Sequence, residues 1–411
     1  MASQTVTSPA PAKAVIHPLR NSNFRLLWAG ATVSVLGDQF YLVALPWLIL
    51  QLTNSSVVLG AIMMMASVPR AVLMLLGGAV SDRFSPRRVM IMTASTRTIF
   101  VGAIGALLWL HVLQLWHLYV LAFAFGVSDA FGVPAAQAFM PSLVEPEQLP
   151  AANSVAQVSI QLSTIVGPAP AGLVVKSLGA AWAFIIDAIS FLFIIGALWK
   201  LPDPPVPAVR AARPGMWKSI VAGLKYMNGD DALRSLLLIS ACLNFCITGP
   251  FGIGLPWIAR TRFATPVAYS IFVSAAAAGG LLGALAAGVF RPRRRGRFLI
   301  LVSGVIAACM FAIGLLGGLW SLAAVLFVVG LSAGFINVHV FAWFQQRVER
   351  EMLGRAMSVL MFAGFGLQPV SLLIAGVVVK AGVAVLFTMA GVLLTLVTLR
   401  AAFVAPVRNI E

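Results

Sequence analysis

Long apolar runs separated by short polar turns make up most of the sequence. Each run is about as long as the 20 or so residues that an α-helix needs to cross a bilayer. We therefore expect twelve membrane-spanning helices, over residues 24–52, 56–80, 89–110, 118–140, 151–175, 181–199, 233–257, 266–290, 298–315, 319–344, 353–379 and 383–404. Glycine and proline inside the runs fit membrane helices, where neighbouring helices satisfy the freed backbone groups. The pattern predicts an all-α integral membrane protein.

One long polar stretch interrupts the pattern between the sixth and seventh runs. Its first part is rich in proline and is expected to be an extended linker. Residues 216–227 then alternate apolar and basic side chains, which suits a helix on the inner membrane surface. The chain is accordingly divided into an N-terminal tail (1–23), a six-helix bundle (24–200), a linker with an amphipathic segment (201–231), a second six-helix bundle (232–404) and a C-terminal tail (405–411).

Two sequence matches indicate that the second half repeats the first. The pattern Leu-Leu-Gly followed by Phe-x-Pro-Arg-Arg occurs at 75–88 and again at 281–294. The pattern Ala-Gly-x-Val-Val-Lys occurs at 171–176 and at 375–380. Both spacings are close to half of the 411 residues. Such internal duplication is common in secondary transporters, so the twelve helices are expected to form two pseudo-symmetric bundles.

The composition is that of a membrane protein, and the distribution of charge explains why the chain is basic. Hydrophobic residues make up 60% of the chain and charged residues 10%, which no soluble fold accommodates. The net charge is +16, but 22 of the 28 lysines and arginines fall on one face of the expected topology and four on the other. This bias places both termini in the cytoplasm, in a bacterial inner membrane. It is a topology signal and does not predict nucleic-acid binding.

Five ionisable residues are expected inside the spans: Asp38, Arg70, Arg97, Asp129 and Asp187. Each costs roughly 2.5–3.5 kcal/mol near the bilayer centre, so their presence predicts a cavity, ion pairs or both. We take the three aspartates as candidates for proton coupling, with Asp38 first, and the two arginines as their charge partners. The alternative for Asp38 is a permanent ion pair with Arg70 or Arg97 that only holds the bundle together.

The turn between the second and third runs packs an acid among arginines after a pair of glycines. It resembles the signature loop of the major facilitator superfamily, with Ser85 where that family usually has glycine. The resemblance implies the major facilitator fold, with two bundles that rock about a central cavity. It also implies a gating motif in which Asp82 braces one state against the start of the eleventh helix, near Gly354 and Arg355. The matching motif residues are Gly78, Asp82, Arg83, Arg87 and Arg88.

A second motif narrows the resemblance to the drug/proton antiporters of this superfamily. Residues 167–172 are similar to their antiporter motif, through Gly167, Pro168 and Gly172. Residues 37–47, 134–153 and 351–355 resemble the branch of macrolide-type and siderophore (enterobactin-type) exporters. The resemblance implies efflux of a small amphipathic substrate in exchange for protons, by a monomer that uses the proton gradient and no cofactor.

Polar and aromatic residues of the expected spans are candidates to line the substrate cavity. They are Gln137, Asn244, Asn337, His339 and Trp343. A lone histidine on an apolar helix is more often a packing residue, and His339 is weighed against that alternative. Cys242 and Cys246 share a helix face, but without a histidine or third thiol nearby we expect no metal site.

Two rival functions remain open at this point. The first is an exporter or flippase for a siderophore or a lysophospholipid, which differs from a drug exporter in whether the cavity opens sideways to lipid. The second is a non-transporting membrane scaffold, which exclusive pairing of the acids with arginines would favour. We expect no enzyme and no catalytic residues, because no metal-ligand cluster, glycine-rich phosphate loop or nucleophile–base pair stands out in the sequence.

Overall fold

The computed structural model of the protein describes residues 18–83, 85–203, 216–290, 292 and 294–403. These ranges are almost entirely helical and contain no β-strand. They include twelve spans that are long and apolar enough to cross a membrane. The prediction of an all-α, multi-pass membrane protein with twelve spans is confirmed.

The first six spans consist of seven helices, because the fifth span is divided at Gly167. They are α1 (Ser22–Thr53), α2 (Ser56–Arg83), α3 (Pro86–Trp109), α4 (Leu115–Phe139), α5 (Leu149–Val166), α6 (Pro168–Ser177) and α7 (Ala180–Lys200). Short 3₁₀ turns precede α1 and connect α4 to α5, at Pro18–Arg20, Met140–Ser142 and Pro146–Gln148. Proline follows the division as the first residue of α6, a position that needs no backbone N–H.

The last six spans are divided more often. The seventh comprises α9 (Asp231–Gly249), the π-helical turn η4 (Pro250–Gly254), α10 (Leu255–Ile258) and a second π-helical turn, η5 (Ala259–Phe263). The others are α11 (Pro266–Val289), α12 (Arg295–Leu315), α13 (Leu319–Arg347), α14 (Arg350–Phe365), α15 (Gln368–Val378) with the 3₁₀ turn η6 (Val379–Ala381), and α16 (Val383–Phe403). The eleventh span is divided between α14 and α15, as the fifth span is divided between α5 and α6.

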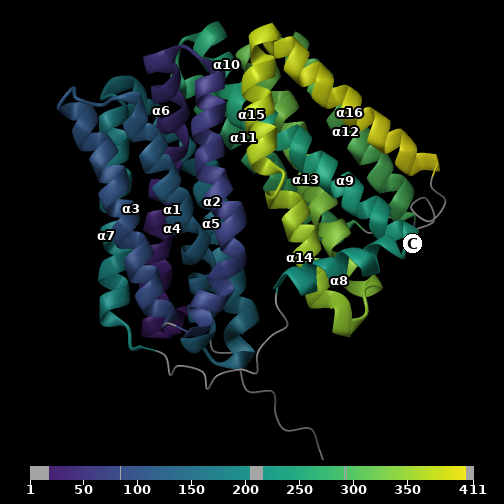
Figure 1. Cartoon of the computed structure of the whole chain (residues 1–411), viewed down its shortest axis with the longest axis horizontal. Helices are drawn as coiled ribbons and strands as arrows, with labels where there is room; N and C mark the ends of the chain where they lie inside the picture. The colour runs from purple at the N-terminus through teal and green to yellow at the C-terminus, as the bar shows by residue number, and fades with distance from the viewer. Residues whose placement is uncertain (1–17, 84, 204–215, 291, 293, 404–411) are drawn as a thin grey trace, which may run out of the picture.

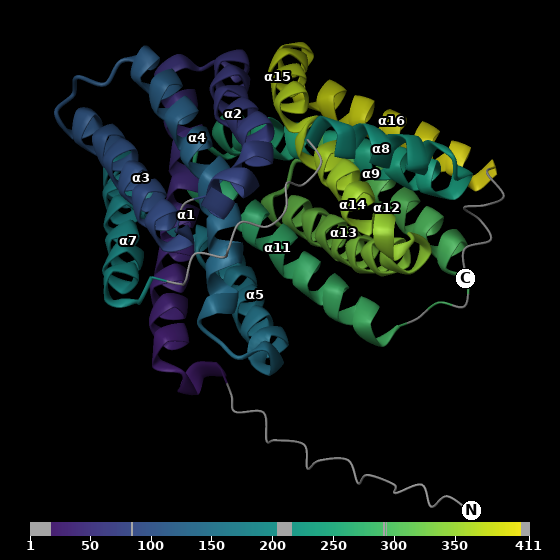
Figure 2. The same ribbon diagram turned by 60° about the horizontal axis from the view of Figure 1, so that its bottom comes forward.

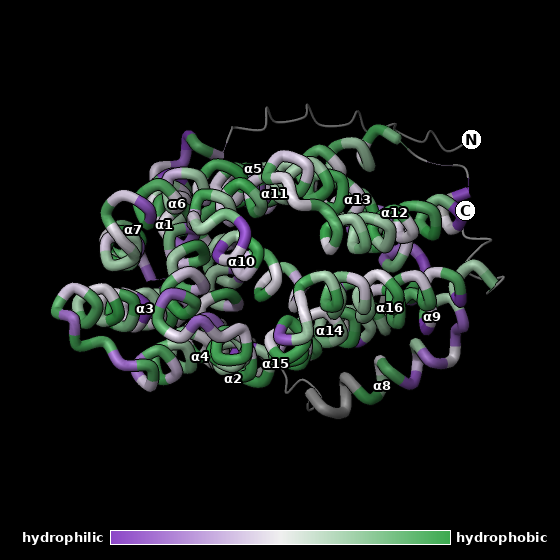
Figure 3. Tube along the Cα trace, turned by 90° about the horizontal axis from the view of Figure 1, so that it is seen from above, coloured by the Kyte–Doolittle hydropathy of each residue, from purple (hydrophilic) through white to green (hydrophobic). Residues whose placement is uncertain are grey.

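The helices form two groups side by side. Figure 1 shows α1–α7 on one side and most helices of the second half on the other, with α10 between them at the top. The two groups are closest at this end, which carries α6, α10 and α15, and diverge toward the end that carries α8. We call these the distal end and the linker end. Seen from above in Figure 3, both groups carry hydrophobic residues around their whole circumference, as expected of helices in lipid.

The linker contains the helix that its amphipathic pattern predicts. This helix, α8 (Met216–Asn228), packs against α14 and α9 at the linker end, as Figure 2 shows. Gly223 makes the approach close: a Cβ there would lie 2.6 Å from the carbonyl oxygen of Arg355. The described part of the linker helix is therefore docked on the second group.

The two groups contact each other through backbone and small residues near the distal end. Ser56 Oγ at the start of α2 donates a hydrogen bond of 2.8 Å to the carbonyl oxygen of Gly376 in α15. One turn later, a Cβ on Gly60 would lie 2.8 Å from the carbonyl oxygen of Leu372. The Arg260 guanidinium of η5 lies 5.4 Å from the Trp47 ring of α1. Contacts of this kind hold the distal end closed in this structure.

Inside the second group, α11 and α13 are the most closely packed pair. Glycines spaced by four residues face each other across this contact, at 279 and 283 on α11 and at 330 and 334 on α13. A Cβ on Gly330 would overlap the carbonyl oxygen of Ala276, and one on Gly283 would overlap that of Leu331. In membranes such small-residue contacts replace the hydrophobic effect as the source of helix association.

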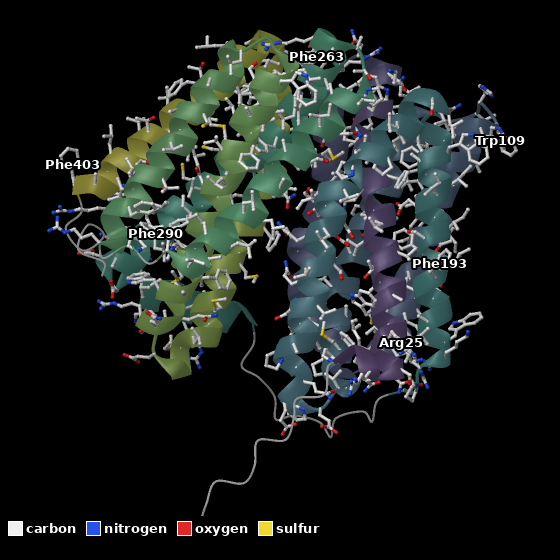
Figure 4. The ribbon with its side chains drawn as sticks, turned by 180° about the vertical axis from the view of Figure 1, so that it is seen from behind. Arg25, Trp109, Phe193, Phe263, Phe290 and Phe403 are labelled. Atoms are coloured by element: carbon white, nitrogen blue, oxygen red, sulfur yellow. The ribbon has the colours of Figure 1, made fainter. Side chains whose placement is uncertain are left out.

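Large apolar side chains cover the outer surface. Phe193 on α7 and Phe403 on α16 are 57% and 85% exposed and point away from the helices in Figure 4. Trp109 and Trp320 are similarly exposed, near helix ends. An outward apolar surface of this extent is consistent with contact to lipid.

We expect Gly330→Ala to lower the melting temperature of the protein in detergent, because overpacking of a tight contact costs about 1–3 kcal/mol. Gly304→Ala, on α12, is the matched control, since no heavy atom lies within 4 Å of the Cβ it would add. The control should melt at or slightly above the wild-type temperature. Equal effects of the two substitutions would contradict the close packing of α11 on α13.

Candidate functional site

Arg87 of the signature loop lies against the end of α7, in its own half of the chain. Arg87 Nε donates a hydrogen bond of 2.6 Å to the carbonyl oxygen of Leu198, and Arg87 Nη2 one of 3.1 Å to that of Trp199. Carbonyls in the last turn of a helix have no partner within the helix, so a cation is favourable there. Arg87 therefore caps α7.

Asp203, three residues after α7, completes this arrangement. Its carboxylate lies 3.3 Å from Arg87 and 3.7 Å from Arg88, and it accepts a hydrogen bond of 2.8 Å from Ser85 Oγ. The hydrogen bond from Ser85, together with the neighbouring Arg87 and Arg88, holds the pKa of Asp203 below its usual value. Sequence reasoning did not single out Asp203, because a lone acid in a proline-rich linker has no recognisable spacing.

Gly78, Asp82 and Arg83 of the expected gating motif lie outside the residues whose side chains the structure describes, as does Gly354. The expected contact of Asp82 with the start of the eleventh span therefore stays a prediction. Arg355 is described, and its Nη1 lies 3.4 Å from the sulfur of Met352 in the preceding turn.

The antiporter-type motif lies where α5 gives way to α6. Gly167 ends the first helix, and a Cβ there would lie 2.5 Å from Gln39 Cγ on α1. A Cβ on Gly172 would overlap Ser270 Oγ on α11. The motif thus permits close approach of α1 on one side and of the second half on the other.

The five ionisable residues that the sequence predicts inside the spans converge from five helices, α1, α2, α3, α4 and α7. Asp129 lies at their centre, with 13% of its side chain exposed. Its Oδ1 accepts a hydrogen bond of 2.7 Å from Arg97 Nη2, and its Oδ2 lies 3.2 Å from Arg70 Nη1. Arg97 Nη1 also lies 3.7 Å from Asp38 Oδ1. We call these four residues and Asp187 the charge cluster.

Aromatic rings hold the guanidinium of Arg97 in place. Its Cζ lies 4.4 Å from the ring centroid of Phe125 and 5.1 Å from that of Phe191. Tyr41 stacks on the other face of Phe125, with centroids 4.4 Å apart. Because ring faces attract cations, the rings stabilise Arg97 without neutralising an acid.

The three aspartates of the cluster differ in pairing and exposure. Asp129 is paired with two arginines. Asp38 has one long ion pair, a side chain that is 30% exposed, and an Oδ1 with no hydrogen bond. Asp187 is fully buried, and its Oδ1 accepts a hydrogen bond of 3.4 Å from Ser190. Among the described residues, its Oδ2 has no hydrogen-bond partner and no cation forms an ion pair with its carboxylate. The cluster therefore contains one acid more than it has arginines.

The candidates for the substrate cavity differ in their exposure. Gln137, Asn244 and Asn337 are exposed. His339 is buried, with its ring 4.4 Å from that of Phe335, and Trp343 packs in an apolar cluster with Ala401.

Two further features were missed by sequence reasoning. Asp230 accepts hydrogen bonds from the backbone N–H groups of Ala232 and Leu233 at the start of α9, and from Arg347 at 2.9 Å. Partial burial acts to raise the pKa of Asp230, but these hydrogen bonds outweigh it and leave the pKa lowered. The other feature is a contact between halves: Arg70 Cζ lies 5.6 Å from the ring centroid of Phe365.

The described residues contain no group of three or more histidine, cysteine, aspartate or glutamate side chains that could hold a metal ion. Cys242 and Cys246 lie on one face of α9 with their sulfurs 3.9 Å apart.

The sequence matches the family model of the Major Facilitator Superfamily over residues 27–371. It is 26% identical to macrolide efflux protein A of Streptococcus pyogenes over 399 residues, which cover 94% of this chain and 97% of the relative. It is 25% identical to the enterobactin exporter EntS of Shigella boydii over 337 residues, which cover 81% and 79% of the two chains.

Solved structures share the fold at low sequence identity. The nucleoside transporter NupG superimposes with a TM-score of 0.73 at 14% identity, covering 93% of this chain and 98% of that one. A D-xylose-proton symporter gives 0.72 at 15% identity, covering 94% and 99%. A bacterial homologue of ferroportin in an inward-facing state gives 0.71 at 15% identity, covering 93% and 98%.

We expect Asp129→Asn to destabilise the protein by about 3–5 kcal/mol, because it leaves two arginines without their shared carboxylate. Asp38→Asn should cost less, since Asp38 has one ion pair of 3.7 Å. Asp231→Asn is a suitable control, because its pair with Arg234 is largely exposed and such pairs contribute little. Thermal melting in detergent measures all three. A wild-type melting temperature for Asp129→Asn would refute the central role of Asp129.

The stabilisation that Asp203 provides through its contacts with the signature loop should decrease at low pH. A carboxylate whose pKa is lower in the folded state stabilises that state at pH values above its ordinary pKa, which is 3.8 for aspartate. This stabilisation is lost as the pH falls through the lowered pKa of the folded state. Asp203→Asn should therefore lower the melting temperature at pH 7 and have a smaller effect near pH 3. If Asp203→Asn lowers the melting temperature by the same amount at both pH values, the result would contradict a stabilising role of the ionised Asp203 carboxylate.

Proposed function

Since the chain belongs to the Major Facilitator Superfamily, we propose that it exports amphipathic small molecules, macrolide-like compounds first among them, in exchange for protons. The protein is a multi-pass membrane transporter rather than an enzyme. Similarity to two exporters over most of the chain supports export as the direction of transport. The protein is proposed to act as a monomer, driven by the proton gradient without a cofactor.

The proposed topology places the linker end in the cytoplasm of a bacterial cell, with both termini on that side of the inner membrane. The excess of lysine and arginine on this side supports it. With that topology, closed contacts at the distal end correspond to an inward-facing conformation. The two halves, residues 24–200 and 232–404, are the bodies proposed to rock against each other.

The charge cluster carries the proposal of proton exchange. A scaffold would be expected to pair every acid with an arginine, whereas this cluster has one acid in excess. Asp38 is the proposed exchange site, because its side chain is partly exposed and its ion pair with Arg97 is long. Burial without an ion pair to a described cation favours the neutral, protonated form of Asp187. Protonation of Asp38 would then change the cluster from neutral to a net charge of +1.

The remaining candidates take supporting roles in this proposal. Gly167, Pro168 and Gly172 let α5 and α6 pack closely on α1 and α11, which keeps the distal end sealed. Arg87 and Arg88, with Asp82 and Arg83, gate the linker end. The exposed side chains of Gln137, Asn244 and Asn337 are proposed to meet substrate.

A siderophore is the second candidate substrate, and similarity to an enterobactin exporter favours it. Enterobactin-type siderophores and macrolides differ in charge, since the former carry acidic catechols and the latter a basic amine. A panel that includes both classes distinguishes them.

The test is proton release from purified protein in weakly buffered detergent solution on addition of each compound. We expect release from wild type with a macrolide and no release from Asp38→Asn, while binding of the compound measured in parallel is retained. Asp231→Asn, an exposed acid at the linker end, serves as the control and should release protons as wild type does. Binding without release from wild type would rule out coupling at Asp38, and release only with the siderophore would reassign the substrate.

A further inference from the structure

We propose that Arg70 is a positioning residue that carries the charge state of the cluster to the second half, through the contact of its guanidinium with the ring of Phe365. The proposal rests on the proposed function, because it gives the route by which a proton on Asp38 would act on the other half.

Arg70 touches both halves. On one side its Nη1 lies 3.2 Å from Asp129 Oδ2, and on the other its Cζ lies 5.6 Å from the centroid of Phe365. Both side chains are about one-third exposed, at 36% and 37%. A guanidinium within about 6 Å of a ring centroid is attracted by the ring face, more strongly where water is partly excluded.

The two partners of Arg70 compete for it. Asp129 is shared between Arg70 and Arg97, and Arg97 is shared in turn between Asp129 and Asp38. A proton on Asp38 removes one of the two carboxylates that form ion pairs with Arg97, so Arg97 binds Asp129 more strongly. Asp129 then attracts Arg70 less, and the balance moves toward Phe365. Loss of the proton reverses each step.

The other charged or titratable groups near this route act on Arg97. Tyr41 on α1 and Asp187 on α7 interact electrostatically with Arg97, together with Asp38 and Asp129. Arg97 is fixed between two rings, so it has little freedom to leave the cluster. Arg70 has more, because it is the more exposed of the two arginines, at 36% against 18%.

Phe365 lies at the break in the eleventh span, where a change in its attraction to Arg70 could move α14 relative to α15. It is the last residue of α14, directly before the break that separates α14 from α15. On the distal side of that break, α15 is fixed to α2 through Gly376 and Leu372. On the other side, α14 continues to the linker end and carries α8. A change in the attraction between Arg70 and Phe365 therefore acts at the junction between α15, which is held against α2, and α14, which is not.

The test compares Phe365→Leu, Phe365→Trp and the control Phe362→Leu in drug efflux from proteoliposomes. Phe362 occupies the preceding turn of α14 and is 42% exposed. We expect Phe365→Leu to reduce the efflux rate about fivefold, the size of a cation–π contact, while proton release on substrate addition stays at the wild-type level. Phe365→Trp should retain the rate within about twofold, because indole binds cations at least as well. Phe362→Leu should behave as wild type.

Two efflux results would overturn the proposal. The first is an efflux rate of Phe365→Leu equal to that of wild type. The second is an equal loss of efflux rate in the leucine and tryptophan variants, which would mean that only packing matters. A double-mutant cycle of Arg70→Gln and Phe365→Leu in thermal melting checks the contact itself, and additive effects would also overturn it. Failure of the proposed function is recognised separately, as absence of proton release from wild type. In that case the efflux ratio of the two Phe365 variants still decides whether the contact matters.

Discussion

Charges inside a membrane-spanning bundle must neutralise one another, and this constraint shapes the first half of the protein. Five helices each supply one member of the charge cluster, and their relative positions are set by the reach of Arg97 and Arg70 around Asp129. Removing any paired member leaves an uncompensated buried charge, which costs more than the pair itself contributes. The ion pairs of the cluster therefore link α1, α2, α3 and α4, and Asp187 on α7 adds one acid in excess.

Charged residues inside the spans are divided unequally between the two halves. The second half associates through glycines that bring helix backbones into contact, as at Gly283 and Gly330. Its described acids, such as Asp230, lie at the linker end rather than inside the spans. A half that is apolar inside moves as a body at little electrostatic cost, whereas the charged half can change its net charge. This division suits a transporter in which the first half senses protons and the second half responds.

The linker end differs from the distal end in how its contacts are made. At the distal end the halves meet through backbone groups and small residues, such as Ser56 with Gly376, which leave little room for adjustment. Among the described residues of the linker end, ion pairs join the bundles to the linker segments next to them: Arg87 with Asp203, and Arg347 with Asp230. Ion pairs that are partly exposed are weak and exchange partners readily. The linker end can thus reorganise while the distal contacts persist.

The sequence by itself determined the fold class, the twelve spans and the duplication, because apolar runs of bilayer length and a repeated motif are local properties of the chain. It also supplied all five members of the charge cluster, since ionisable residues inside apolar runs are conspicuous wherever they finally lie. Only the tertiary structure decided how they pair. The sequence left Asp38 with either arginine as a partner, whereas the fold gives both arginines to Asp129 and leaves Asp38 with a long contact. The roles of Asp203 and Phe365 were likewise invisible, because each depends on a residue more than 100 positions away, and such proximity is set by helix packing and not by spacing along the chain.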